Sequence, residues 1–274
     1  MLHDAVVVQA LVAGTVVAVL CGCVGVFVVL RRQSFAGHAV TDIGFTGGAG
    51  APLIGAEPIA GLLAFSVAGA LSMAWLGNRV RERDVATGVV LTAALGVGSL
   101  FLFIQTRYVS EPASLLFGSV FAIRSSVLLG TIWIGVGCLV ALAALYRPLV
   151  FSTVNREAAG ARGVPLAFVD AAFLVVMAVA VAEAAQLIGV LLTTALLIGP
   201  ASAASSLCRG IRRTIVVATV FGVALMWLSI GLAYASYTFP PGGKGWPVGF
   251  FLGGLTLALY AATQAIEHAR ARLR

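Results

Sequence analysis

The chain has 274 residues, of which 61% are hydrophobic and only 10% are charged, and its formal net charge is +7. Soluble domains carry about 25% charged residues, so one water-soluble core could not hold this much apolar surface and lipid must solvate part of it. The positive charge does not indicate nucleic-acid binding, because the arginines stand in twos and threes between apolar blocks. The composition therefore predicts one polytopic membrane domain over residues 1–274 that contacts lipid and no nucleic acid.

Apolar blocks separated by charges and prolines predict an all-α bundle of eight or nine transmembrane helices. The expected spans are 5–30, 34–51, 59–77, 86–105, 126–146, 166–182, 186–199, 214–235 and 247–266. The second and seventh are shorter than the roughly 20 residues that a bilayer requires, as central helices of a bundle can be. A helix continuing through Glu183 and Gln186 would leave eight crossings instead of nine.

The arginines set the expected orientation. With the N-terminus outside and the spans alternating, fourteen of the seventeen basic residues fall in cytoplasmic loops. These are Arg31, Arg32, Arg79, Arg81, Arg83, Arg147, Arg156, Arg162, Arg209, Arg212, Arg213, Arg270, Arg272 and Arg274, and only Arg107, Arg124 and Lys244 fall outside. Since cytoplasmic loops of membrane proteins carry an excess of Lys and Arg, this split predicts an outer N-terminus and a cytoplasmic C-terminus.

The second span carries two ionisable side chains, His38 and Asp42, into an otherwise small and apolar helix. A spacing of four residues puts both on one helix face, with Cβ atoms roughly 5–6 Å apart. An Asp near the middle of a membrane helix costs about 2.5–3.5 kcal/mol to insert, which favours a functional role. Imidazole and carboxylate suit Zn²⁺, Mn²⁺ or Fe²⁺.

Two ligands from one helix leave a metal site incomplete. If the protein is a two-fold dimer with this helix at the axis, the partner supplies the same pair, and two His with two Asp make a four-ligand site. The alternative is a local hydrogen bond between His38 and Asp42 that only lowers the cost of insertion.

Three other acidic residues lie in or beside the spans. Glu57 and Glu183 are expected at outer helix ends, where water reaches them, and Asp170 near the inner end of its span, so all three are expected to be solvated or helix-terminal. An alternative for Glu183 is that it lines the transport pathway. The cytoplasmic stretch 147–165 is amphipathic and predicts a helix lying at the membrane surface.

A second cytoplasmic stretch, residues 200–213, begins with Pro200, continues with small residues and ends in basic ones. Proline is favoured in the first turn of a helix, so a new helix is expected to start here. Such a segment suits a surface helix that docks on a partner, and the alternative is an ordinary positively charged cytoplasmic loop.

The sequence lacks the motifs of several enzyme classes. It contains no G-x-x-x-x-G-K-[ST] phosphate loop, so the chain is not expected to hydrolyse ATP with a P-loop of its own. It also contains no H-E-x-x-H zinc-protease motif and no nucleophile elbow. The chain is therefore expected to be a transport subunit and not an enzyme.

Several stretches resemble one known family. They are Leu-Arg-Arg-Gln-Ser-Phe-Ala-Gly at 30–37, Asn-Arg-Glu-Ala-Ala-Gly-Ala-Arg-Gly-Val at 155–164, and the outer turn at 234–241. The strongest match is residues 187–201, which are close to the pattern V-G-x-L-L-x-x-A-L-L-x-x-P-A-A. These stretches resemble bacterial ABC-type permeases for zinc, manganese and iron, in order and over nearly the whole chain.

The resemblance implies a type II ABC importer permease in the bacterial inner membrane. It implies a homodimer, a cytoplasmic ABC ATPase subunit, a metal-binding protein on the outer face, and a divalent metal as cargo with no permanently bound cofactor. It also implies that the stretch after Pro200 is the coupling helix that contacts the ATPase. The implied coupling residues are Pro200, Ala201, Ser202, Ala203, Ala204, Arg209, Arg212 and Arg213.

The sequence departs from the family at one point. Span two of these permeases usually reads Gly-Asp-x-x-x-His, whereas here Gly37 is followed by His38 and, four residues on, by Asp42. The two ligand types remain on one face, so metal passage is still expected. Two alternatives stay open: a secondary transporter driven by an ion gradient, with Asp42 as its protonated carboxylate, and an ABC permease for a siderophore or cobalamin-type cargo.

Overall fold

Helices make up the regular structure of the computed structural model, which describes residues 5–76, 83–104, 118, 120–122, 125–238 and 245–272. The long helices are α1 (Ala5–Leu30), α2 (Ser34–Gly50), α3 (Pro58–Leu76), α4 (Arg83–Ile104), α6 (Ser125–Val154), α8 (Leu166–Ile188), α9 (Val190–Leu207), α10 (Ile211–Ala235) and α11 (Val248–Arg272). The shorter elements are η1 (Ala51–Ile54), η2 (Val120–Ala122), α7 (Arg156–Ala161) and η3 (Ser236–Thr238). No strand occurs in these ranges, which confirms the all-α prediction.

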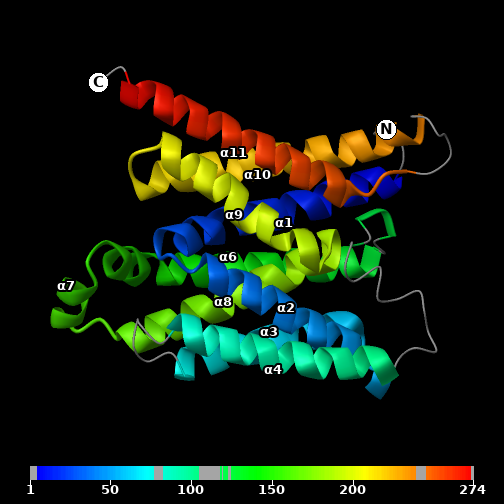
Figure 1. The fold of residues 1–274 in the computed structure, drawn as a ribbon, viewed down its shortest axis with the longest axis horizontal. Helices are drawn as coiled ribbons and strands as arrows, with labels where there is room; N and C mark the ends of the chain where they lie inside the picture. The colour runs from blue at the N-terminus through cyan, green and yellow to red at the C-terminus, as the bar shows by residue number, and fades with distance from the viewer. Residues whose placement is uncertain are drawn as a thin grey trace.

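The long helices run side by side along the longest axis of the molecule (Figure 1). In that view α9, α10 and α11 lie on one side, α2, α3 and α4 on the other, and α1, α6 and α8 between them. Eight of the described helices are long and apolar enough to cross a membrane, and α2, with 17 residues, is the ninth long helix. The start of α1 and the end of α11 lie at opposite ends of the bundle.

Helices of similar composition occupy different environments in this bundle. The most apolar windows of α4 and α8 have nearly equal mean hydropathies, 2.1 and 2.2, yet 11% of the α4 window is buried against 61% of the α8 window. A helix that is apolar all round satisfies either a protein core or lipid. The core of this bundle is therefore formed by α1 and α8, whereas α4 is peripheral.

Small residues bring α2 close to α3. A Cβ atom at Gly47 would overlap the backbone carbonyl of Gly61, and one at Gly69 would stand 2.8 Å from Cγ2 of Ile43. Backbones that approach this closely exclude larger side chains, as is typical of helix interfaces in membranes. The Thr46 hydroxyl adds a hydrogen bond of 3.0 Å to the carbonyl oxygen of Ala94 on α4. These contacts hold α2 against both α3 and α4.

The boundary between the sixth and seventh expected spans lies later than predicted. Helix α8 passes through Glu183 and Gln186 and ends at Ile188, and α9 begins at Val190. The break is at Gly189, whose φ of 86° lies in the left-handed region that glycine adopts without strain. The expected ranges 166–182 and 186–199 are corrected accordingly, and nine long helices remain.

The stretch after Pro200 is not a separate surface helix, which corrects the prediction for residues 200–213. Pro200 lies inside α9, which continues to Leu207, and Ala201, Ala203 and Ala204 are buried. The small side chains of Ala201 and Ala204 pack with Val26 of α1 and Ala218 of α10. The predicted start failed because Pro can stand inside a membrane helix when the surrounding helices compensate for its missing N–H.

The contact between α1 and α9 is made by backbone. A Cβ atom at Gly25 of α1 would overlap the carbonyl oxygen of Leu197 on α9 and would lie 3.3 Å from Cβ of Ala201. The chain then turns at Cys208–Gly210, where Gly210 has a φ of 100°. Arg209, Arg212 and Arg213 are exposed at this turn and at the start of α10.

Two further helices extend beyond their expected ends. Helix α6 continues through Pro148 to Val154, and the expected surface helix in 147–165 is reduced to the six residues of α7. Helix α11 continues to Arg272 instead of ending at residue 266. In both cases the helix continues past the apolar block that marked the expected span.

Candidate functional site

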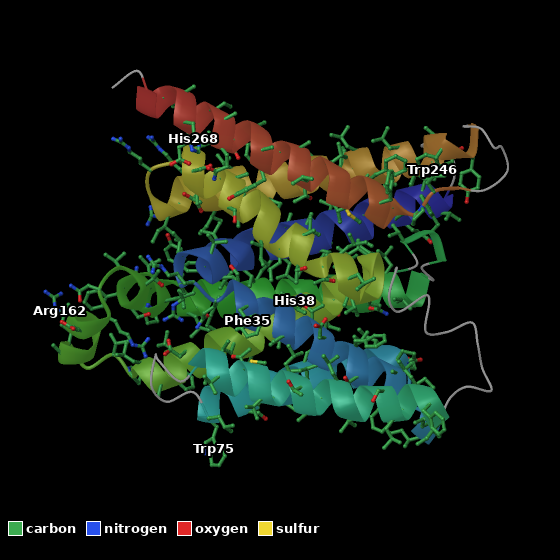
Figure 2. All side chains as sticks on the ribbon, viewed as in Figure 1. Phe35, His38, Trp75, Arg162, Trp246 and His268 are labelled. Atoms are coloured by element: carbon green, nitrogen blue, oxygen red, sulfur yellow. The ribbon has the colours of Figure 1, made fainter. Side chains whose placement is uncertain are left out.

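His38 and Asp42 lie on α2 with their side chains next to each other. The distance from Nε2 of His38 to Oδ2 of Asp42 is 3.6 Å, and the side chains are 51% and 22% exposed, respectively. This distance exceeds a hydrogen bond, so the alternative of a local His–Asp hydrogen bond is not what the structure shows. Figure 2 places His38 near the middle of the bundle, far from both of its ends.

The pair belongs to the one face of α2 that its neighbours leave open. Phe35, His38, Asp42 and Phe45, which we call the α2 stripe, are exposed or half-buried, and their spacing of three or four residues places them on one side of the helix. The rest of α2 is largely buried from Gly37 to Ala49. Because ionisable groups facing lipid are costly in the middle of a membrane, this face requires a polar passage or a second protein surface.

The start of α2 is fixed by the end of α1. Arg32 has a φ of 56°, and the N–H of Gln33 donates to the carbonyl oxygen of Val28 at 2.8 Å. A left-handed residue followed by this backward hydrogen bond is a common way to end a helix. The N–H of Gly37 then donates to the carbonyl oxygen of Gln33 at 2.9 Å. His38 therefore lies in the first turns of a new helix whose direction is set by this turn.

A buried ion-pair cluster lies beside that turn, and the sequence interpretation did not identify it. Asp170 of α8 accepts from Nη2 of Arg31 at 2.8 Å and from Nη2 of Arg156 at 2.7 Å, one bond to each carboxylate oxygen. Nη2 of Arg31 also donates to Oγ of Ser152 at 3.1 Å, and its guanidinium lies over the ring of Phe173. We call Arg31, Arg156 and Asp170 the Asp170 cluster.

Asp170 lies near the start of α8, at the end of the span where the sequence placed it, but it is not solvated. Its side chain is only 6% exposed and is paired with two arginines. Arg156 is held in place because it is the first residue of α7, which Asn155 caps by accepting from the N–H of Ala158 at 2.9 Å. The presence of Asp170 in an apolar span could have indicated this cluster, because a carboxylate in such a span needs a cationic partner.

Glu183 is also misplaced by the prediction. It is 2% exposed, because α8 continues past it to Ile188 and covers the expected outer end. Its carboxyl interacts with Thr131 and Cys138 of α6. Its assignment to the transport pathway remains a prediction.

A single chain offers few ligands for a metal ion. Within the described ranges, no group of three or more His, Cys, Asp or Glu side chains lies close enough together to hold one. The four cysteines are free, and the side chain of Cys23 contacts the hydroxyl of Thr219 at 3.7 Å. His38 and Asp42 thus form half of a four-ligand site at most.

Known proteins share both the sequence pattern and the fold. The model of the ABC 3 transport family matches residues 3–245. The manganese transport system membrane protein MntC of Halalkalibacterium halodurans is 30% identical over 217 residues, covering 78% of this chain and 74% of that protein. MntC of Listeria monocytogenes is 29% identical over 232 residues, covering 84% and 81%.

A solved structure extends the likeness to the fold. One chain of PsaBC from Streptococcus pneumoniae, solved in complex with Fab, superimposes with a TM-score of 0.80 at 22% identity. The match covers 95% of this chain and 91% of that chain. The arrangement of helices described above is therefore one found in a known bacterial membrane protein.

Proposed function

The chain belongs to the ABC 3 transport family and is a multi-pass protein of the bacterial inner membrane, and from this premise we propose that it is the permease subunit of an importer for a divalent transition metal. Manganese is the metal best supported, because the two relatives described above are named as manganese transport proteins. Zinc and iron are the competing cargoes.

The α2 stripe carries this proposal. Two copies of the chain that meet along this face would bring together two imidazoles and two carboxylates, a mixed set of nitrogen and oxygen donors compatible with Mn²⁺, Fe²⁺ and Zn²⁺. In this arrangement the second copy would cover the two side chains that a single copy leaves partly exposed. Helix α2 would then line the route of the metal at the two-fold axis.

A separate ATPase would supply the energy. The exposed arginines of the Cys208–Gly210 turn and the start of α10 offer a basic surface for it, and α9 connects that surface to the interior of the bundle. An extracytoplasmic metal-binding protein would deliver the ion at the opposite end. Family membership favours this arrangement over a carrier driven by an ion gradient, and a site of four closely spaced ligands favours a bare ion over a siderophore or cobalamin-type cargo.

Metal uptake tests the proposal in cells that express the complete transporter. His38→Gln and Asp42→Asn each remove one ligand per copy and should lower manganese accumulation by about tenfold or more at equal expression. His268→Gln is a matched control, because His268 is exposed on α11 and lies outside the stripe. Normal uptake by both stripe variants would remove the site assignment, and selective loss of zinc or iron uptake would identify another cargo.

A further inference from the structure

Among the described residues, Glu183 is a buried carboxyl group without a counter-charge. Its side chain is 2% exposed in the interior helix α8, neither carboxyl oxygen makes a hydrogen bond of standard geometry, and the hydroxyl of Thr131 is the polar group that acts on it. Asp170, thirteen residues earlier on the same helix, has two arginines in the same environment. The same helix thus holds one compensated and one uncompensated carboxyl group.

The helices packed against α8 offer no cation at the level of Glu183. Helices α3 and α9 contain no Asp, Glu, Lys, Arg, His or Cys. The titratable side chains of the other packed helices are Cys21 and Cys23 on α1, His38 and Asp42 on α2, Cys138, Tyr146 and Arg147 on α6, and Arg156 and Glu157 on α7. Of these, Cys138 interacts with Glu183, and a thiol cannot supply a positive charge.

The charge state follows from this environment. An ionised carboxylate buried without a cation or hydrogen-bond donors is strongly unfavourable, whereas the neutral acid loses far less on leaving water. We propose that Glu183 is a proton-binding site, occupied in the conformation of this structure, which releases its proton to water when the adjoining end of the bundle opens. The step is a simple ionisation of the carboxylic acid and forms or breaks no other bond.

The turn between α8 and α9 is the end of α8 from which water would reach Glu183. Glu183 lies six residues before Gly189, so about 9 Å of helix separate it from this turn. Gly118 lies against the turn, since a Cβ atom at Gly118 would stand 2.6 Å from the backbone nitrogen of Gly189. Water that passed this contact would hydrate Glu183 and favour the ionised form, so proton binding favours the arrangement in which Glu183 stays buried.

Infrared spectroscopy of the full chain in lipid nanodiscs tests the proposal without any transport assay. At neutral pH, the difference spectrum between wild type and Glu183→Gln should show a carboxylic-acid C=O band that only the wild type has. Asp170→Asn is the matched control and should remove carboxylate bands instead, because Asp170 is ionised between two arginines. Loss of carboxylate bands in Glu183→Gln would overturn the proposal.

Stability provides a second, independent readout. Since glutamine resembles the neutral acid in size and charge, Glu183→Gln should unfold within about 3 °C of wild type. A much larger drop would show that the ionised form is the native one and would contradict the proposal. If Glu183→Gln does not fold, Glu183→Asp keeps a carboxyl group and should shift the carboxylic-acid band, and an unchanged band would assign it to another residue. Because neither measurement involves a metal, their failure would leave the proposed transport function untouched.

Discussion

The Asp170 cluster and the α2 stripe both place a carboxylate beside a nitrogen base inside an apolar bundle, but they use it differently. In the cluster, both carboxylate oxygens are bound at 2.7–2.8 Å and the Asp170 side chain is 6% exposed. In the stripe, the two groups are 3.6 Å apart and His38 is half exposed. The carboxylate of Asp170 is occupied by its two arginines. His38 and Asp42 do not bind each other, so their lone pairs remain available to a ligand. Polar groups of similar chemistry thus serve as structure in one place and as a site in the other.

The largest effect on stability is expected from a substitution of Asp170. Asp170→Ala leaves the buried guanidinium of Arg31 without its carboxylate, and we expect a loss of about 3–5 kcal/mol in the free energy of unfolding. Thermal unfolding of the purified protein measures it. Asp42→Ala is the counterpart in the open pair and should unfold near the wild-type temperature. Equal losses in the two variants would mean that the stripe is structural as well.

The next test exchanges the two groups of the stripe. The double variant His38→Asp with Asp42→His keeps both donors on one face of α2, so manganese uptake should remain within about tenfold of wild type. Either single substitution leaves each copy with two identical groups and should reduce uptake further. Uptake assays at matched expression compare the three variants, and a double variant as inactive as the singles would show that the order of the ligands is essential.

Cross-linking examines whether the open face meets a second copy. In a background with the native cysteines replaced by serine, Phe45→Cys should form a disulfide between two chains, because Phe45 lies on the same side of α2 as Asp42. Leu257→Cys on α11 is a control of higher accessibility, since Leu257 is 68% exposed whereas Phe45 is half-buried. Dimers in gel electrophoresis without reductant give the answer, and equal cross-linking at both positions would point to random collision.

The smallest expected effect concerns Arg156. Its side chain is 40% exposed, so solvent already screens its ion pair, and Asp170 keeps Arg31 when Arg156 is removed. Arg156→Gln should therefore lower the free energy of unfolding by only about 1 kcal/mol. A loss as large as that of Asp170→Ala would place Arg156, and not Arg31, at the centre of the cluster.

The sequence predicted the features that depend on neighbouring residues. His38 and Asp42 share a face because a helix brings residues four apart together, and the apolar blocks located all nine long helices. It could not predict the Asp170 cluster, because Arg31 and Asp170 are 139 residues apart and meet only through packing of the whole bundle.

The errors of interpretation have a common origin. Glu183 and Pro200 were each interpreted as marking the end or start of a helix, since polar residues and prolines usually do so in water. Inside this bundle both lie within helices, because surrounding helices bury the first and tolerate the second. The proposed protonation of Glu183 follows from its burial, which the sequence did not show.

The backbone contact between Gly25 and Leu197 has a mechanical consequence. With no side chain between them to flex, α1 and α9 must shift together, and the shared contacts of Val26, Ala204 and Ala218 add α10 to the same rigid block. A push on the arginine-bearing turn after α9 would thus reach Arg31, which follows the C-terminal end of α1 on the same side of the bundle, just before the helix that carries the proposed metal ligands. Helices α1, α9 and α10 would therefore transmit the movement as one unit. The close contact on which this depends is possible because residue 25 is glycine and has no Cβ atom.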